Sequence, residues 1–379
     1  MLEAYRLQRS LGDSGLGELY ACTNRAGDDA ILELIYRKYV PNLDLEVLRD
    51  AAARTHLCSG HPLIPPIIGL VSVDNRPGTL VRAYDGRDVA VLAATVPPPV
   101  PAVLEIVAQV ADALDHAWNR VENDGKPLHW WHGDVRPQQI IVDARGDLSL
   151  QGFGLLEALG GTTPTAVFTA FTYMSPELLL SQKHPRADIY ALAITAYELL
   201  TSDRTGLGPT AAPGERDHGL AMAGRIEKLR SCAGDATAEL FEAMSRWDPN
   251  TRLPHAEVVE RARAAGGAKA ALVAWASATH GALPSLNFTA FDPDPLIGRP
   301  ASPIAIGPPA PTTGHRFKRA ASKGTEPPSL TRLVGGLDAP PSQQAGMLSR
   351  TSAIAVGLAI GVGAGAVGLG AMWLAAKLL

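Results

Sequence analysis

The hydrophobic pattern of this chain changes near residue 100, and no other feature constrains its fold as much. Before that point short apolar runs alternate with turn residues, which is typical of an antiparallel sheet, and one helical stretch interrupts them at 44–58. After it, apolar residues recur at helical spacing. A β-rich half followed by an α-rich half predicts an α+β fold with two lobes, which we place at 1–86 and 87–282. The predicted helices of the second half are 101–121, 186–201, 219–232, 235–247 and 254–264.

The composition changes again after these two lobes. Residues 283–345 hold 12 prolines in 63 positions, and such sequence buries too little apolar surface to order itself. We therefore expect a Pro-rich disordered linker over 283–349. Beyond it, the 24 residues 353–376 contain no charged side chain, and about 20 apolar residues are enough for a helix to span a bilayer. The sequence predicts a transmembrane helix there, with a buried core helix as the alternative.

The flanks of this span predict how it lies in a cell membrane. Basic residues gather on its N-terminal side and only Lys377 follows it, so the positive-inside rule places the preceding residues in the cytoplasm. We expect a single-pass anchor. Gly357, Gly361 and Gly365 share one helical face, which would let a second span pack closely and form a dimer. A chance repeat in Gly-rich sequence explains this spacing equally well.

Charge and cysteine content exclude several classes of protein. With 34 Lys and Arg against 38 Asp and Glu, the net charge is −4, which gives no reason to expect a nucleic-acid partner. Cys22, Cys58 and Cys232 lie far apart and form no CxxC pair. We therefore expect neither disulfides nor a structural metal site.

Several short motifs follow one another in a fixed order. The first is a Gly-rich turn at 11–20, with Gly12, Gly15 and Gly17. The second is His132-Gly133-Asp134-Val135-Arg136-Pro137-Gln138-Gln139-Ile140-Ile141, followed by Gly152-Phe153-Gly154. The last three are Tyr173-Met174-Ser175-Pro176-Glu177, Asp188-Ile189-Tyr190-Ala191-Leu192 and Asp248-Pro249-Asn250-Thr251-Arg252. Asp134 and Gly152 are 18 positions apart, and Gly152 and Glu177 are 25 apart.

In this order and spacing the motifs resemble those of the protein kinase family, in its bacterial Ser/Thr branch, over about residues 5–265. The resemblance implies a bilobal kinase-like fold with a β-rich N-lobe and an α-helical C-lobe. It also implies that Gly12, Gly15, Gly17, Ala30 and Ile141 would contact a nucleotide. Asp134 would occupy the position of the catalytic base, and Arg136 that of the usual loop lysine.

The residues that handle phosphate and metal in that family are replaced here. The family's third-strand lysine, which holds the nucleotide phosphates and pairs with a helix-C glutamate, aligns with Leu32, and the glutamate with Glu46 or Asp50. The other replaced positions are Ser14 in the Gly-rich loop, Gly133 for an arginine, Gln139 and Gly152 for the two metal ligands, and Ala170 for a threonine. Without a carboxylate ligand, Mg²⁺ binding is disfavoured.

The residues that maintain the fold in that family are retained. By resemblance, Glu177 and Arg252 form an ion pair that ties the activation segment to the helical lobe, and Asp188 anchors the catalytic loop. His132 and Phe153 match members of an internal hydrophobic column. Asp134 is retained as well, and we interpret it as vestigial rather than catalytic.

These losses and retentions favour a membrane-anchored pseudokinase that binds a protein partner, either a kinase or a substrate, as a scaffold. ATP binding would be weak. One alternative is an active Ser/Thr kinase with displaced catalytic groups, and another is a nucleotide sensor without turnover. The hinge between the lobes is expected at 81–84, where Arg82 at the back wall of the pocket would obstruct adenine.

Overall fold

A computed structural model describes residues 5–121, 125–159, 172–180, 182–203, 214–283 and 296–304. The chain divides by its internal contacts into two units, Met1–Phe317 and Lys318–Leu379, and every described residue belongs to the first. The predicted transmembrane helix at 353–376, with Gly357, Gly361 and Gly365, lies outside the described residues, as does Ala170. Within the described ranges, no helix is both long and apolar enough to cross a membrane.

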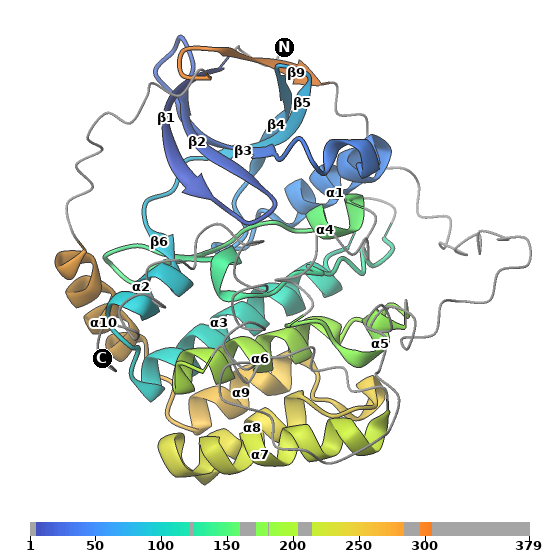
Figure 1. The fold of residues 1–379 in the computed structure, drawn as a ribbon, viewed down its shortest axis with the longest axis vertical. Coiled ribbons are helices and arrows are strands. Elements are labelled where there is room, and N and C mark those ends of the chain that lie inside the picture. The colour runs from blue at the N-terminus through green and yellow to red at the C-terminus, as the bar shows by residue number, and fades with distance from the viewer. Residues whose placement is uncertain are drawn as a thin grey trace, which may run out of the picture. The chain divides into compact units, whose positions relative to one another are not determined.

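The N-terminal half forms a closed antiparallel barrel (Figure 1), in the strand order β1-β2-β3-β5-β4-β9. Its interior is packed with apolar side chains that include Tyr20, Leu32 and Leu80. Successive side chains of a strand point to opposite faces of the sheet, so every second residue of a strand points into the barrel. The strands are β1 (Tyr5–Asp13), β2 (Gly17–Thr23), β3 (Asp29–Ile35), β4 (Ile67–Val73), β5 (Arg76–Arg82) and β9 (Pro300–Ile304).

Strand β9 corrects the prediction of a disordered linker over 283–349. Residues 300–304 pair with β1 on one side and with β4 on the other, and so close the barrel. Ala301 and Leu296 are buried in the barrel core. The Pro-rich composition indicates only how little apolar surface this segment can bury by itself. The unpaired edges of β1 and β4 supply hydrogen-bonding partners that the composition does not reveal. Residues 305–349 lie outside the described part of the chain.

One helix packs against the barrel. Helix α1 (Leu45–Cys58) begins at Asp44, whose carboxylate accepts hydrogen bonds from the backbone N–H groups of Glu46 and Val47. Such a cap satisfies donors that the first turn of a helix leaves unpaired. The helix contacts β4 and the short helix α4 (Leu155–Ala158). The predicted helical stretch at 44–58 is confirmed.

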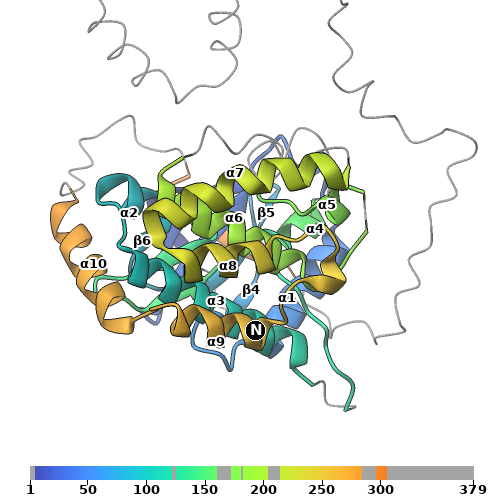
Figure 2. The ribbon, with the colours of Figure 1, turned by 90° about the horizontal axis from the view of Figure 1, so that it is seen from below.

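The C-terminal half is helical, with α3 (Val100–Asn119) and α6 (Ala187–Thr201) at its centre. Helices α7 and α8 lie at the end farthest from the barrel, and α10 packs beside α2 and α3 (Figures 1 and 2). The predicted α+β class with a helical C-lobe is confirmed, although α10 was not predicted. The remaining helices are α2 (Val89–Thr95), α5 (Pro176–Leu179), α7 (Glu215–Ala233), α8 (Asp235–Met244), α9 (His255–Ala264) and α10 (Lys269–Ala282).

A small sheet follows the predicted catalytic-loop segment, between the barrel and the helical half. It consists of β6 (Arg87–Asp88), β7 (Ile140–Val142) and β8 (Leu148–Leu150) in antiparallel order. Three 3₁₀ turns complete the described elements, at Val40–Asn42, Pro137–Gln139 and Pro249–Thr251. The sheet fixes both ends of the loop between β7 and β8, so the motif residues on either side of it have defined positions.

Candidate functional site

A narrow cleft lies between the barrel and the segment 138–155. Its upper wall comes from β2, β3, β5 and α1, and its lower wall from β7, β8 and the residues that follow them. The space open to the centres of water molecules is about 40 Å³. Since a cavity needs about 10–15 Å³ on this measure to hold one water, the cleft admits several waters and is narrow in the observed arrangement.

The register of β3 corrects the position predicted for the family's lysine. Leu32 is 0% exposed and packs inside the barrel, so it faces away from the cleft. Ile31 and Glu33 face the cleft, opposite Val81 and Thr79 of β5. The position that corresponds to the family's lysine is therefore Glu33, and Ile31 rather than Ala30 lines the pocket. The motif was placed one residue too early, and a one-residue slip moves every side chain of a strand to the other face.

Glu33 is buried beneath the Gly-rich turn. Its carboxylate accepts a short hydrogen bond from the hydroxyl of Ser14. Burial raises the pKa of Glu33 and the charge of Asp134 raises it further, whereas the Ser14 hydrogen bond and the charge of Arg136 lower it. The net shift is upward. The motif pattern alone does not single out Glu33, although one signal in the sequence points to it: Glu33 is a lone charge in the otherwise apolar run Ala30–Ile35.

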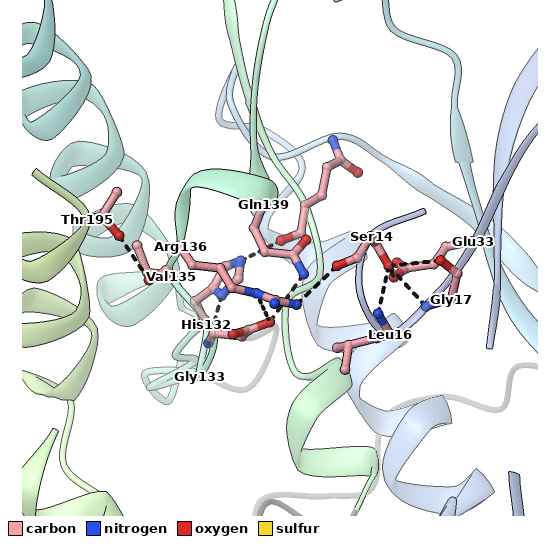
Figure 3. Close-up of polar contacts among 12 residues, drawn as sticks. Ser14, Leu16, Gly17, Glu33, His132, Gly133, Val135, Arg136, Gln139 and Thr195 are labelled. Carbon is pink, nitrogen blue, oxygen red and sulfur yellow. Dashed lines mark hydrogen bonds and ion pairs between the residues drawn. The ribbon is translucent and has the colours of Figure 1, made fainter. Parts of the chain in front are cut away.

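Arg136 fills the space between the Gly-rich turn and the catalytic loop (Figure 3). It is 1% exposed, and its guanidinium donates to Asp134 Oδ2 at 3.0 Å from Nε and to the backbone oxygen of Ser14 at 3.1 Å from Nη2. A Cβ atom at Gly15 would lie 3.2 Å from Nη1 of Arg136. The turn is therefore closed onto the arginine, and the φ angle of +85° at Gly15 favours a residue without a side chain there.

Asp134 is enclosed by these partners. Besides Arg136, the amide of Gln139 donates to Asp134 Oδ2 at 3.2 Å. Burial raises the pKa of Asp134, and the contacts with Arg136 and Gln139 offset that effect only in part. On its other side Asp134 faces a hollow of about 10 Å³, which has room for about one water. Asp134 is 4% exposed, so its carboxylate is largely shielded by the described residues around it.

Gly152 stands where the family has a metal-binding aspartate, and its left-handed backbone conformation strains any residue that carries a side chain. Its φ angle is +82°, and a Cβ atom would lie 2.8 Å from Oε1 of Gln139. In the described part of the chain, no group of three or more His, Cys, Asp or Glu side chains is placed to hold a metal ion. Gly152 supplies no carboxylate for the magnesium ion that phosphoryl transfer requires.

Helix α6 holds the backbone of the catalytic loop. The carboxylate of Asp188 accepts from the N–H of His132 at 2.7 Å and of Gly133 at 2.9 Å, where Gly133 has a φ of +85°. Burial raises the pKa of Asp188 to about 7 in spite of these two hydrogen bonds. The ring of His132 packs on that of Phe153 with centroids 4.5 Å apart, and burial lowers the pKa of His132 to about 4.

Glu177 and Arg252 meet in the ion pair that the resemblance implies. Two guanidinium nitrogens of Arg252 donate to the two carboxylate oxygens of Glu177 at 2.6 and 2.7 Å. The same guanidinium donates to the backbone oxygens of Arg186, Arg246 and Trp247. This contact joins α5 to the segment that precedes α9.

The structure differs from the prediction for helix C. Glu46 pairs with Arg49 on the surface, and its side chain is 79% exposed. Asp50 pairs with Arg54 at 2.6 Å and does not line the cleft either. The α1 residues that line the cleft are Leu48, Ala51, Ala52 and Thr55. No acidic residue of α1 faces the position of the missing lysine.

Two more predicted nucleotide contacts are corrected. Arg82 is exposed and does not line the cleft, so it cannot obstruct adenine; Val81 and Tyr84 line the cleft instead. Gly12, Gly15 and Gly17 are absent from the described lining, where Ser14 represents the Gly-rich turn. Ile141 lines the cleft as predicted. Among the described residues of the turn at 11–20, Ser14 and Leu19 line the cleft.

Comparison with known proteins gives consistent matches over the same region. A family model described as "Protein kinase domain" matches residues 5–262. The serine/threonine-protein kinase PknH of Mycobacterium bovis is 29% identical over 282 residues, covering 66% of this chain and 45% of PknH. The tyrosine-protein kinase MasK of Myxococcus xanthus is 26% identical over 276 residues, covering 67% of this chain and 41% of MasK.

Solved structures show the same fold. The crystal structure of the PknI kinase domain of Mycobacterium tuberculosis matches with a TM-score of 0.51 at 24% identity, covering 70% of this chain and 96% of that one. The chain spans less than half the length of the curated relatives PknH and MasK. The residues 5–262 that match the family model include strands β1 to β5 of the barrel and the helices from α1 through most of α9.

Proposed function

The chain belongs to the protein kinase family, and from this premise we propose that it is a pseudokinase, which binds a partner through a kinase fold without transferring phosphate. The observation that carries the proposal is the buried carboxyl of Glu33 at the position where the family needs a lysine. Two unit charges 4 Å apart interact by about 4 kcal/mol at an effective dielectric constant of 20. A charged Glu33 would therefore repel the phosphates that a lysine attracts, and a protonated Glu33 would contribute no attraction.

Phosphates would also need space that side chains and backbone already occupy. Ser14, Arg136 and Asp134 are joined by hydrogen bonds across the phosphate end of the cleft. Arg136 could in principle screen phosphate charge, but its guanidinium is already bound to Asp134 and to the Gly-rich turn. An incoming triphosphate would have to break these contacts, and no carboxylate at Gly152 would bring a metal ion to compensate. Each lost electrostatic contact of this kind raises a barrier by about 2.7–4 kcal/mol.

The test is a thermal-shift titration of the full chain with ATP, with and without Mg²⁺, combined with an autophosphorylation assay. We expect no Mg²⁺-dependent stabilisation and no incorporated phosphate. Stabilisation that requires Mg²⁺, together with phosphate transfer, would establish the alternative of an active Ser/Thr kinase. Stabilisation by ATP without transfer would establish the alternative of a nucleotide sensor.

The proposed scaffold acts at a membrane, with residues 353–376 as a single-pass anchor and the kinase-like part in the cytoplasm. The support is the uncharged 24-residue run and the basic flank that precedes it. Deleting residues 350–379 should move the protein from the membrane fraction to the supernatant. If the shortened chain still sediments with membranes, another segment is the anchor.

The proposed partner is a protein, either an active kinase or its substrate. The fold supports this proposal because its supporting contacts, such as Glu177–Arg252 and Asp188 with the catalytic loop, are kept while the phosphate-handling groups are lost. Pairing of two spans through Gly357, Gly361 and Gly365 is part of the same proposal. Replacing the three glycines with isoleucine should then abolish crosslinking between two copies in membranes, and unchanged crosslinking would refute the pairing.

A further inference from the structure

Strand β9 belongs to the barrel, although the whole helical half separates it in sequence from the other strands. It follows α10, which packs beside α2 and α3, whereas β9 lies between β1 and β4 (Figure 1). The 12 residues 284–295 connect α10 to the segment 296–304, which contains β9. Connections within compact domains have a median of about 4–6 residues, and 12 residues span up to about 40 Å when extended. The length of this connection therefore does not restrict β9 to the barrel of its own chain.

The segment 296–304 is held in the barrel by several kinds of contact. Its strand pairs with β1 on one side and with β4 on the other. The N–H of Gly298 donates to the backbone oxygen of Leu7 at 2.7 Å, and the N–H of Leu7 donates to that of Arg299 at 3.2 Å. The guanidinium of Arg299 pairs with Asp74, in the turn between β4 and β5, at 3.2 Å. The gap between β1 and β4 is therefore a site that recognises this segment by hydrogen bonds and by charge.

Among the strands of the barrel, β9 has the fewest paired positions. It pairs at two positions with β1 and at three with β4, whereas β2 and β3 pair with each other at seven. Pro300 and Pro303 have no N–H to donate, and both prolines and Ser302 are exposed. The side chains that the segment buries in the core are Ala301 and Leu296. We therefore expect β9 to leave the barrel more readily than the other strands do.

A barrel without β9 would need another strand in its place. The edges of β1 and β4 would present unpaired N–H and C=O groups, and such edges pair with strands of other chains. Tyr5 and Val71, which lie opposite β9 residues in the two registers, are 6% and 0% exposed and would lose part of their cover. A second copy of this chain carries the segment 296–304 itself, so it matches the gap in every contact described above.

We propose that two copies of this chain exchange β9, so that residues 296–304 of each copy complete the barrel of the other. Each barrel keeps its contacts, because the segment that enters has the same sequence as the segment that leaves. Exchange of an identical element is a low-cost route to a dimer, and its extent rises with the concentration of the chain. The proposal is independent of phosphate transfer and of any pairing between the spans at 353–376.

A disulfide between β4 and β9 reports which chain supplies the strand. Ser72 and Ser302 are paired in the register, and Cα atoms of paired residues in antiparallel strands lie about 4.5–5.5 Å apart, within the range that a disulfide bridges. One full-length chain carries Ser72→Cys and another, with a different affinity tag, carries Ser302→Cys. Both carry Cys232→Ser, because Cys232 is exposed. After mixing and oxidation, we expect a covalent product that contains one chain of each kind, and its share should rise with the concentration of the mixture.

The matched control mixes the Ser72→Cys chain with a Ser231→Cys chain, whose new thiol lies at an exposed position of α7. Association through any other part of the chain crosslinks both mixtures alike, whereas exchange of β9 favours the first. The double variant Ser72→Cys/Ser302→Cys shows whether the two positions can form a disulfide at all. If it oxidises within one chain while the first mixture gives no more covalent dimer than the control, the proposal is overturned. It is overturned as well if the double variant forms no disulfide, since β9 would then not lie beside β4.

Discussion

The ion pair between Glu177 and Arg252 gives the sharpest prediction about stability. Arg252 is 1% exposed, and its guanidinium donates to both carboxylate oxygens of Glu177 at 2.6 and 2.7 Å. In the variant Glu177→Gln the guanidinium keeps its charge but loses the opposite charge. Removing one partner of a buried pair destabilises a protein by about 3–5 kcal/mol, because the other charge is left uncompensated. We expect a loss of about 3 kcal/mol, at the lower end, since backbone oxygens of Arg186, Arg246 and Trp247 still accept from Arg252.

The matched control is Glu257→Gln on α9. Glu257 also pairs with an arginine, Arg261, but the two side chains are 39% and 51% exposed and lie one helical turn apart. Exposed pairs at this spacing contribute about 0.3–0.5 kcal/mol. The measurement is urea-induced unfolding followed by tryptophan fluorescence, on the unaltered chain and on each variant. If Glu177→Gln lowers the free energy of unfolding by less than 1 kcal/mol, or by no more than the control does, the reasoning about burial is refuted.

Three further predictions follow from other parts of the structure. Burial lowers the pKa of His255 from 6.5 to about 4, so the unfolded chain binds the proton more tightly, and His255 alone should remove up to about 3 kcal/mol of stability as pH falls from 6.5 to 4. His255→Gln should reduce the slope of the unfolding free energy against pH in this range by the contribution of one histidine, while His132, whose pKa is lowered in the same way, keeps its own; an unchanged slope would contradict the assignment. Ala301→Arg in β9 places a long charged side chain at a position that is 1% exposed. The melting temperature should therefore fall, and proteolysis at 284–304 should accelerate. An unchanged melting temperature would mean that β9 does not contribute to the stability of the barrel. Gly152→Asp should destabilise the fold, because its Cβ would lie 2.8 Å from Oε1 of Gln139. It should not restore phosphate transfer, because Glu33 would remain at the lysine position. Measurable kinase activity in this single variant would show that the missing metal ligand was the only obstacle.

At the candidate site, some residue positions predicted from the motifs agree with the structure and others do not. The order of the motifs placed Asp134, Asp188, Glu177 and Arg252 correctly relative to one another, because each of these contacts joins segments whose spacing the fold preserves. The motif pattern on β3, however, aligned the family's lysine position with Leu32, although Glu33 is the residue that faces the cleft. Hydrophobic-Ala-hydrophobic patterns fit an apolar strand in more than one register, and only the direction of each side chain selects between them.

The amino-acid sequence by itself determined the α+β class and the two lobes, since hydrophobic period is a local property, and the resemblance of its motifs to those of kinases implied that Gly152 lacks a metal-binding carboxylate. The tertiary structure alone decided that a glutamate replaces the lysine, that Arg136 occupies the space between Asp134 and the Gly-rich turn, and that residues 300–304 close the barrel. Each of these depends on partners that are distant in sequence: Ser14 and Arg136 are 122 positions apart, and β9 pairs with β1 from the other end of the described chain. Such contacts form because folding brings unpaired acceptors and sheet edges from distant segments together. A local sequence pattern does not predict contacts of this kind.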